Sequence, residues 1–278
     1  AEDPVREDIA TVLYNIALTQ YWCARYGEAT ETLEKLLPLR HNLLKKGGEL
    51  KNYCAALVLK GNCHINQPHE AQQAKDSYEK AVDLLLKMSE GQPDKDCATV
   101  ITNLGHACGL LEDWKDGVTW FRQALQMKKI IYQEVKSSPE VAESCFLLAR
   151  ALFECGEHEE ALVFYQEALA RHLSLKSTDD VLECLLYIAR CYRSLKVFEK
   201  VLETFVEAEK LCSTCAEING RIVMLIYQEM ADFFTEEEVT NKTKAIQSLQ
   251  KVAAILERIK DEETLAEVQA KILSLELS

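Results

Sequence analysis

One pattern of small and apolar residues recurs along the chain about every 44 residues, and this repetition constrains the fold more than any other feature. The stretch NLGHACGLLEDWKDGVTWFRQAL, from Asn103, aligns with LLARALFECGEHEEALVFYQEAL, from Leu147, at a constant offset of 44. The small residue that marks each copy stands at Ala17, Gly61, Gly105, Ala149, Ala189 and Ala231. A period of this length indicates a stacked array, in which each unit buries its apolar face against its neighbours.

Each copy contains two runs of apolar residues at i, i+3, i+4 and i+7, separated by a short polar or glycine-bearing break. This spacing predicts two antiparallel helices per copy. The small marker residue lies on the first helix, and an aromatic residue of the second helix, at Tyr78, Phe121, Tyr165 or Phe205, is predicted to fill the adjacent gap. Glycine and proline are scarce, at 10 and 5 residues, which also favours helices over sheets joined by tight turns.

The prolines indicate several helix boundaries. Pro4 and Pro139 each follow a residue that can cap a helix, so both are predicted at the first helical position. Pro68 and Pro93 are likewise predicted to open helices. Pro38 falls inside the stretch ETLEKLLPLRHNLL, which we predict as one helix with a kink at the proline.

The pattern of a Leu-Gly or Leu-Ala pair, a later alanine, an aromatic residue and another alanine resembles the tetratricopeptide repeat. The period of 42 to 44 residues exceeds the usual 34, which is similar to the long repeats of kinesin light chain and nephrocystin-like proteins. The resemblance implies an all-α, right-handed superhelical solenoid of about six antiparallel helix pairs. We expect one domain over residues 1–278, with units at about 8–47, 50–90, 95–137, 139–176, 179–214 and 218–260 and a capping helix at 262–278.

In such a stack the first helix of each unit lines the inner groove, and the resemblance implies that this groove binds peptides. The exposed positions expected there are Tyr14, Asn15, Leu18, Tyr21, Asn62, Asn103, His106, Phe146, Arg150, Phe153, Tyr187, Arg190 and Arg193. In the kinesin light chains and their relatives, an asparagine at the slot of Asn15 and Asn103 binds the ligand backbone. An amide both donates and accepts, so it suits an extended peptide, and the arginines would select carboxylates by bidentate contact.

A purely structural role for the same residues stays open. The three groove arginines can pair with Glu143, Glu154 or Glu183 on neighbouring turns and hold the stack together. The asparagines can equally cap neighbouring helices. If the arginines do bind ligand, reversing Arg150 and Arg190 to glutamate is expected to weaken binding and leave melting unchanged.

Candidate metal and catalytic residues do not form a site at this level. His106 and Cys108 are two residues apart on one predicted helix, so their side chains diverge by roughly 200 degrees. Cys212 and Cys215 have metal-ligand or redox spacing, but no second pair matches them. Because no known catalytic motif is present, we expect no enzymatic activity, no cofactor and no metal; a zinc or redox protein is the weakest alternative. Trp114 is expected in or near the core.

Charge and hydropathy limit the classes of partner that the chain is expected to bind. Lys and Arg total 32 against 45 Asp and Glu, a net charge of −13, which argues against nucleic acid. No apolar run approaches the roughly 18 to 20 residues that cross a bilayer, so no membrane partner is expected. The eleven cysteines of this long chain are interpreted as reduced thiols, which favours the cytoplasm, with cytoskeletal association or the nucleus left open. The first residue, Ala1, raises the possibility of an excised fragment.

These observations predict a non-enzymatic adaptor or scaffold whose groove binds a protein or peptide segment with apolar and acidic residues. The alternative is a regulatory or self-assembly arm of a larger protein, using its convex face or its ends. Both the adaptor prediction and this alternative leave open whether the chain associates with a second copy of itself.

Overall fold

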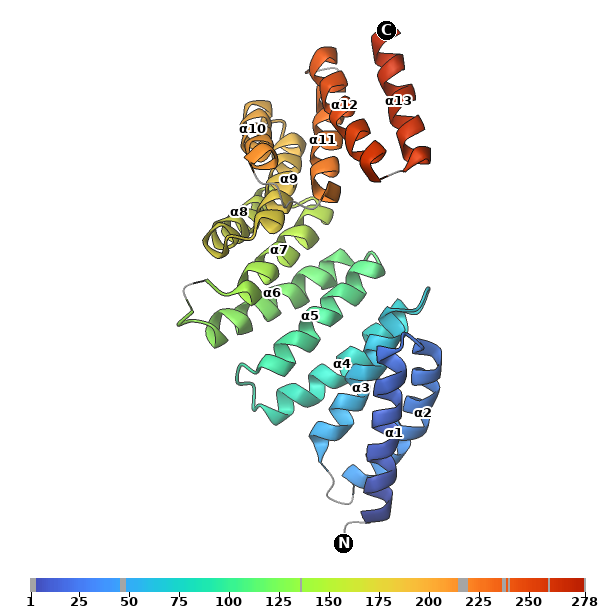
Figure 1. Cartoon of the computed structure of the whole chain (residues 1–278). Coiled ribbons are helices and arrows are strands. Elements are labelled where there is room, and N and C mark those ends of the chain that lie inside the picture. The colour runs from blue at the N-terminus through green and yellow to red at the C-terminus, as the bar shows by residue number, and fades with distance from the viewer. Residues whose placement is uncertain are drawn as a thin grey trace. The chain divides into compact units, whose positions relative to one another are not determined.

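The computed structural model describes residues 4–45, 49–135, 137–214, 220–236, 239, 241–259 and 261–277. These residues form thirteen α-helices and no strand (Figure 1). The helices are α1 Pro4–Trp22, α2 Tyr26–Leu44, α3 Leu50–Ile65, α4 Ala71–Met88, α5 Lys95–Leu110, α6 Trp114–Ile131, α7 Pro139–Glu154, α8 His158–Leu175, α9 Thr178–Ser194, α10 Phe198–Thr214, α11 Gly220–Thr235, α12 Lys242–Ile259 and α13 Glu262–Leu277.

The chain forms two compact units, which are described separately: unit 1 is Ala1–Cys155, with α1 to α7, and unit 2 is Gly156–Ser278, with α8 to α13. In each unit every helix packs against the next one along the chain. The prediction of an all-α stack of helix pairs is confirmed, and α13 covers α12 at the end of unit 2, as expected for a capping helix. That both units belong to one continuous solenoid stays a prediction.

Close contact between a marker glycine and an aromatic ring joins the two helices of a pair in unit 1. A Cβ atom placed on Gly105 of α5 would lie 2.7 Å from Cε1 of Phe121 on α6. A Cβ atom on Gly61 of α3 would lie 2.5 Å from Cε1 of Tyr78 on α4. Both rings are buried, so the predicted filling of the gap by an aromatic residue is confirmed. The backbone of the first helix is therefore part of the packing surface.

The turns inside the helix pairs share one backbone feature. A residue in the left-handed region occurs at Ala24, His69, Glu112, Gly156 and Lys196, which follow the repeat period along the chain. At three of these turns the next amide donates to a carbonyl five residues earlier, as in a Schellman motif: Arg25 N to Gln20 O, Asp113 N to Cys108 O, and Val197 N to Tyr192 O, each at 2.9 Å. Only one of the five left-handed positions is occupied by glycine.

The prolines agree with the predicted boundaries in part. Helix α1 begins at Pro4, and α7 begins at Pro139, where Ser138 Oγ accepts a hydrogen bond from the amide of Val141 at 3.3 Å. Pro38 lies inside the single helix α2, as predicted. Pro68 and Pro93 do not open helices: α4 begins at Ala71 and α5 at Lys95.

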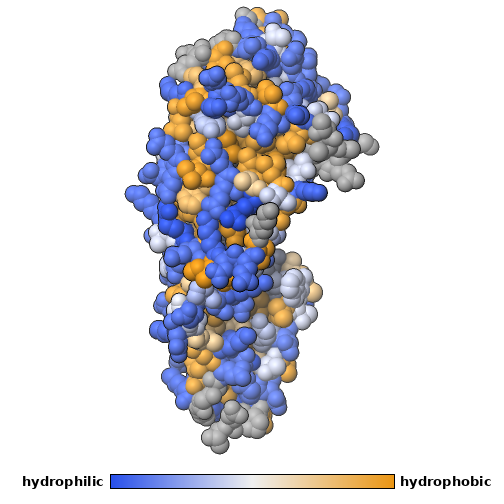
Figure 2. Space-filling model, turned by 90° about the vertical axis from the view of Figure 1, so that its left-hand side faces the viewer, coloured by the Kyte–Doolittle hydropathy of each residue, from blue (hydrophilic) through white to orange (hydrophobic). Residues whose placement is uncertain are grey.

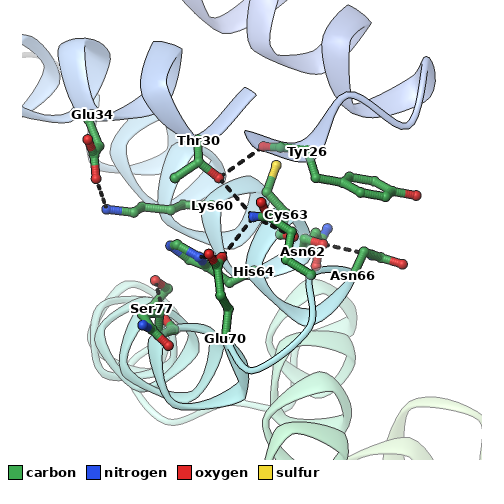
Figure 3. A network of polar contacts seen from close by, with 12 residues as sticks. Tyr26, Thr30, Glu34, Lys60, Asn62, Cys63, His64, Asn66, Glu70 and Ser77 are labelled. Atoms are coloured by element: carbon green, nitrogen blue, oxygen red, sulfur yellow. Dashed lines mark hydrogen bonds and ion pairs between the residues drawn. The ribbon is translucent and has the colours of Figure 1, made fainter. Parts of the chain in front are cut away.

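Side-chain hydrogen bonds explain why the chain continues past Pro68 before α4 begins. Glu70, the residue before α4, accepts a 2.8 Å hydrogen bond from Gln67 Nε2 and lies 2.7 Å from Nδ1 of the buried His64 on α3 (Figure 3). Gln67 also donates to the carbonyl of Cys63 at 3.3 Å. These contacts tie the turn before α4 to the end of α3, and the Glu70 side chain is used for them rather than for capping α4. Lys60 and Glu34 add an ion pair of 3.5 Å between α3 and α2 in the same region (Figure 3).

We predict that Gly105→Ala destabilises unit 1 by about 1–3 kcal/mol, because the added methyl group forces the Phe121 ring to move in a packed core. Gly117→Ala is the matched control, since its Cβ would meet only ordinary contacts, the nearest at 3.7 Å. There the better helix propensity of alanine should leave stability unchanged or raise it by about 0.5–1 kcal/mol. Thermal and urea unfolding followed by circular dichroism measure both. Equal midpoints for the two variants would contradict the importance of the glycine–ring contact.

Candidate peptide-binding groove

Two neighbouring hollows lie on the first-helix side of unit 1, and both are lined by His106. The Trp114 hollow has a volume of about 380 Å³ and is lined by Ile65, Asn66, Gly105, His106, Gly109, Leu110, Trp114, Phe121, Leu147, Arg150 and Ala151. The Lys128 hollow has a volume of about 210 Å³ and is lined by Lys95, Ala98, Thr99, Thr102, Asn103, His106, Lys128, Ile131, Tyr132, Glu140 and Glu143. Helices α5, α6 and α7 contribute to both, so the hollows follow the seam between α5 and α7, the first helices of two successive repeats.

The Trp114 hollow has an apolar floor that the repeat architecture holds in place. Trp114 opens α6, and the neighbouring Asp113 and Asp116 each accept a 3.0 Å hydrogen bond from Lys75 Nζ of α4. A Cβ atom on Gly109 would lie 3.0 Å from Cζ3 of the indole, so the absence of a side chain there makes room for the ring. The indole is thus fixed from two directions.

Arg150 supplies positive charge to this apolar hollow. It is exposed on α7, and it forms no ion pair with any residue in the described part of the chain. An accessible guanidinium beside an apolar surface can bind a carboxylate by donating two parallel hydrogen bonds to it. Of the three predicted groove arginines, Arg150 is the one positioned for such a contact.

His106 separates the two hollows and remains uncharged near neutral pH. Its ring packs edge-on against Phe121, with centroids 5.4 Å apart and planes at 81°. Desolvation of the ring against the protein lowers its pKa below the usual 6.5, although part of the residue is exposed; the nearby positive charges of Arg150 and Lys128 lower the pKa further, whereas Glu143 opposes the shift. His106 is therefore a polar but neutral part of the groove wall.

The predicted groove asparagines lie together in part. Asn62 Oδ1 accepts a 2.7 Å hydrogen bond from the hydroxyl of Tyr78 and a longer, 3.4 Å bond from Nδ2 of Asn103. The two side chains therefore link α3 to α5, which is a structural role that was left open. Asn103 also lines the Lys128 hollow, while Asn15 is exposed on α1 and lines neither hollow.

The remaining predicted residues of unit 1 do not contribute to the two hollows. Tyr14, Leu18 and Tyr21 are half-buried and pack against the core between α1 and α3. Phe146 and Phe153 are half-buried on α7 and are absent from both linings.

In unit 2, the two predicted groove arginines are held by carboxylates of the same unit. Arg190 Nε donates to Glu229 Oε2 at 2.7 Å, and Arg193 Nη1 donates to Glu229 Oε1 at 2.6 Å. Arg193 also pairs with Glu236. These partners come from α11 and the residue after it, not from the Glu143, Glu154 or Glu183 that were considered from the sequence. The arginines therefore link two successive first helices.

Tyr187 belongs to the same cluster. The Arg190 guanidinium lies 5.2 Å from the centroid of the Tyr187 ring, and that ring stacks on Tyr165 with centroids 5.3 Å apart. The expectation that Arg190→Glu leaves melting unchanged is consequently revised, because the new carboxylate would face Glu229 at close range.

Several groove residues were not predicted. Trp114 was expected in or near the core, but it is half-buried and lines a hollow. Lys128 was not predicted as a groove residue. Its helix phase, seven residues after Phe121 and four after Ala124, is the sequence signal that places it on the buried side of α6, unlike the adjacent exposed Lys129.

The cysteines of the described residues are free thiols. Cys108 is buried, and burial raises its pKa to about 11, so it remains protonated as a packing residue. Cys215, the second member of the Cys212 pair, lies outside the described residues. Across the described residues, no group of three potential ligands is placed to hold a metal ion. Among the described helices, none has the length and apolar character that crossing a membrane requires.

Comparisons with known proteins agree with the repeat pattern. The family description of the tetratricopeptide repeat matches residues 141–175. A comparison with curated protein sequences gives no match. The predicted resemblance to tetratricopeptide repeats, including those of kinesin light chain type, is thus confirmed by the family match and by the solved structures that follow.

The chain resembles BtubC (BKLC) from P. vanneervenii, with a TM-score of 0.61 and 16% identity over 76% of this chain and 83% of that one. It also resembles the nearly identical TPR-like repeats of a putative kinesin light chain from Podosopora anserina, with a TM-score of 0.61 and 17% identity over 74% and 96%. A signal-transduction ATPase with a tetratricopeptide repeat sensor from Pyrococcus horikoshii is similar as well, with a TM-score of 0.56 and 14% identity. That match covers 95% of this chain and 36% of the other. These likenesses establish the fold.

We predict that Glu229→Gln lowers the stability of unit 2 by about 1–3 kcal/mol, because at a position only 8% exposed it leaves Arg190 with a neutral partner and Arg193 with Glu236 as its remaining carboxylate. Glu209→Gln is the control: its ion pair with Lys251 is exposed, and its loss should change stability by less than about 0.5 kcal/mol. Urea unfolding at low salt compares the two variants. If Glu229→Gln behaves like Glu209→Gln, the arginine cluster does not stabilise the packing of α9 and α11.

Proposed function

We propose that this array of tetratricopeptide-like repeats is a non-enzymatic scaffold that binds a peptide segment of a partner protein along the α5–α7 seam of unit 1. The Trp114 hollow is the observation that carries the proposal. It combines an apolar floor with the accessible Arg150. Residues of three successive first helices, α3, α5 and α7, line it. Repeat folds of this type generally mediate protein–protein interaction.

The size and chemistry of the hollow define the ligand class. A volume of about 380 Å³ is at the small end of ligand sites, which span roughly 300–1,000 Å³, and suits one large apolar side chain. Arg150 at the rim then favours a carboxylate beside that side chain. We therefore propose a segment in which an aromatic or large aliphatic residue adjoins Asp or Glu, consistent with the ligand predicted from the sequence.

The arginines of unit 2 have a different proposed role. Because Arg190 and Arg193 already share Glu229, a ligand carboxylate would have to displace an internal ion pair to reach them. We assign them to the stability of unit 2, and place the selective contact at Arg150.

The test uses an array of synthetic peptides, each with a Trp, Phe or Leu anchor next to Asp, Glu, Asn or Gln. Wild-type protein should prefer the acidic members, because Arg150 pairs with them. Arg150→Glu should weaken their binding by at least about tenfold, the equivalent of roughly 1.4 kcal/mol, as measured by fluorescence anisotropy.

Lys115→Glu is the matched control, since it makes the same change in charge on an exposed position of α6 that lines neither hollow. It should bind peptides as the wild type does. Equal weakening by both variants would indicate a general charge effect and contradict the site, and failure of every anchor peptide to bind would contradict the proposed function.

A second function, self-assembly, is supported by a different observation on α1. Its exposed face carries the apolar stripe Val5, Ile9, Val12 and Ile16, which are 64%, 48%, 56% and 43% exposed. Two repeats further along the chain, 88 residues later, the positions that correspond to Ile9, Val12 and Ile16 are Cys97, Val100 and Leu104 of α5, and these are buried in the core with residues of α4. The α1 stripe thus has the character of a helix–helix contact surface, and we propose a second copy of the chain as its occupant.

If this second proposal is right, light scattering should give a molar mass that rises with concentration, because apolar stripes of this kind associate by burial. The double variant Ile9→Glu with Val12→Glu should stay monomeric at the same concentrations. A wild-type chain that is monomeric throughout the range would contradict self-assembly through α1 and leave the peptide groove unaffected. Figure 2 shows apolar side chains, in orange, among polar ones, in blue, on the face that it draws, as is usual for a protein surface.

A further inference from the structure

The Lys128 hollow contains charges of both signs in equal number. Lys95 and Lys128 supply two positive charges, and Glu140 and Glu143 supply two negative charges. His106 also lines the hollow, and it is neutral near pH 7 because partial desolvation of its ring lowers its pKa. Tyr132 also lines the hollow. A ligand group that carries a net charge therefore meets repulsion from one pair whichever sign it has.

Lys128 is the least solvated of these groups. Its side chain is only 7% exposed, and it makes no hydrogen bond or ion pair with any residue in the described ranges. Burial lowers its pKa, while Glu143 and Glu140 act in the opposite direction from a distance. Because this largely buried side chain has no acceptor among the described residues and reaches the hollow, an acceptor atom that enters the hollow gains a charge-assisted hydrogen bond.

The carboxylates offer the complementary contact. Glu140 is fixed by a 2.7 Å hydrogen bond from Ser138 Oγ, which lowers the pKa of Glu140 and keeps it ionised. Glu143 is exposed on the same face of α7. Both are acceptors only, so they favour an entering N–H group and repel an entering carboxylate.

We propose that the Lys128 hollow selects a carboxamide, the side chain of Gln or Asn, from the peptide that binds along the α5–α7 seam. A carboxamide is neutral, offers its oxygen to Lys128 and offers two N–H groups to the carboxylates. A Glu or Asp side chain would satisfy Lys128 but face Glu140 and Glu143, and a Lys side chain would do the reverse. This inference rests on the proposed function and adds a second recognition position to it.

The helix geometry gives the spacing of the two recognition positions. The Lys128 hollow is reached from Thr99 of α5 and the Trp114 hollow from Gly109 of the same helix. Ten residues of α-helix rise about 15 Å, and an extended peptide advances about 3.4 Å per residue. The carboxamide is consequently expected about four residues from the apolar anchor.

The probes are fluorescein-labelled peptides with a Trp-Glu anchor, a spacer of one to seven Gly and Ser residues, and Gln, Glu, Lys or Ala at the far position. Anisotropy titrations should give the tightest binding for Gln at a spacer that places it about four residues from the anchor. The advantage over Glu and over Lys is expected to be about tenfold, as for one charge-assisted hydrogen bond. At other spacers, and in the anchor-only peptide, the four residues should bind alike.

Two variants separate the inference from general effects. Lys128→Met keeps the length and the packing of the side chain, and should reduce the advantage of Gln to less than about twofold while anchor-only binding is unchanged. Lys129→Met, at the exposed next residue, should retain the full advantage. Glu143→Gln should shift the preference toward Glu, because it removes one of the two repelling carboxylates.

The outcomes distinguish failure of the carboxamide site from failure of the proposed peptide groove. Anchor peptides that bind without a preference for Gln at any spacer overturn the carboxamide site and leave the proposed function intact. A preference for Glu in the wild type, or a Gln preference that survives Lys128→Met, overturns it as well. If no peptide binds, the anchor-only one included, the proposed function fails and the inference fails with it.

Discussion

In unit 1 the second helix of a pair reaches the first where a glycine takes the place of a side chain, and an aromatic ring covers the exposed backbone. Gly61 with Tyr78 and Gly105 with Phe121 are the two instances, and in each the space for a Cβ atom is already filled by the ring. The contact sets how closely the helices approach and how they are rotated. It also places the face of α5 that carries His106, because His106 follows Gly105 directly and packs on the same ring of Phe121. Packing and groove therefore share one residue pair.

The groove joins two kinds of chemistry because of the way the helices repeat. The apolar floor comes from the start of α6, where Trp114 follows the turn, and the buried Lys128 comes from its far end. First-helix positions one residue past the marker supply His106 and Arg150 in successive repeats. In unit 2 the corresponding residue, Arg190, meets Glu229 instead. One position of the repeat thus provides an accessible arginine in one unit and a structural ion pair in the other.

Much of the fold was predictable because residues that recur at the repeat period are those that pack between neighbouring helices. Small and aromatic residues at fixed spacings specify which helix faces meet, and the structure confirms those pairs. The site was less accessible to sequence reasoning. The sequence identifies Arg190 as exposed on a groove face, but the carboxylate that holds it lies 39 residues further along the chain, on α11. For Trp114, the sequence does not give the depth of the side chain, which decides whether it lies in the core or lines a hollow. The contacts of Gln67 and Glu70 in the turn before α4 involve side chains that the proline pattern does not reveal.

The left-handed turn residues bear on how the chain folds. Ala24, His69, Glu112 and Lys196 take a conformation that a residue with a side chain adopts at a penalty of about 1 kcal/mol, and Gly156 alone takes it freely. Four of the five turns are thus shaped against local preference, and contacts between the paired helices must supply the difference. A helix hairpin of this kind has little reason to form before its helices pack. Folding is expected to proceed from helix–helix contacts toward the turns, so that a pair separated from its neighbours would lose its turn geometry first.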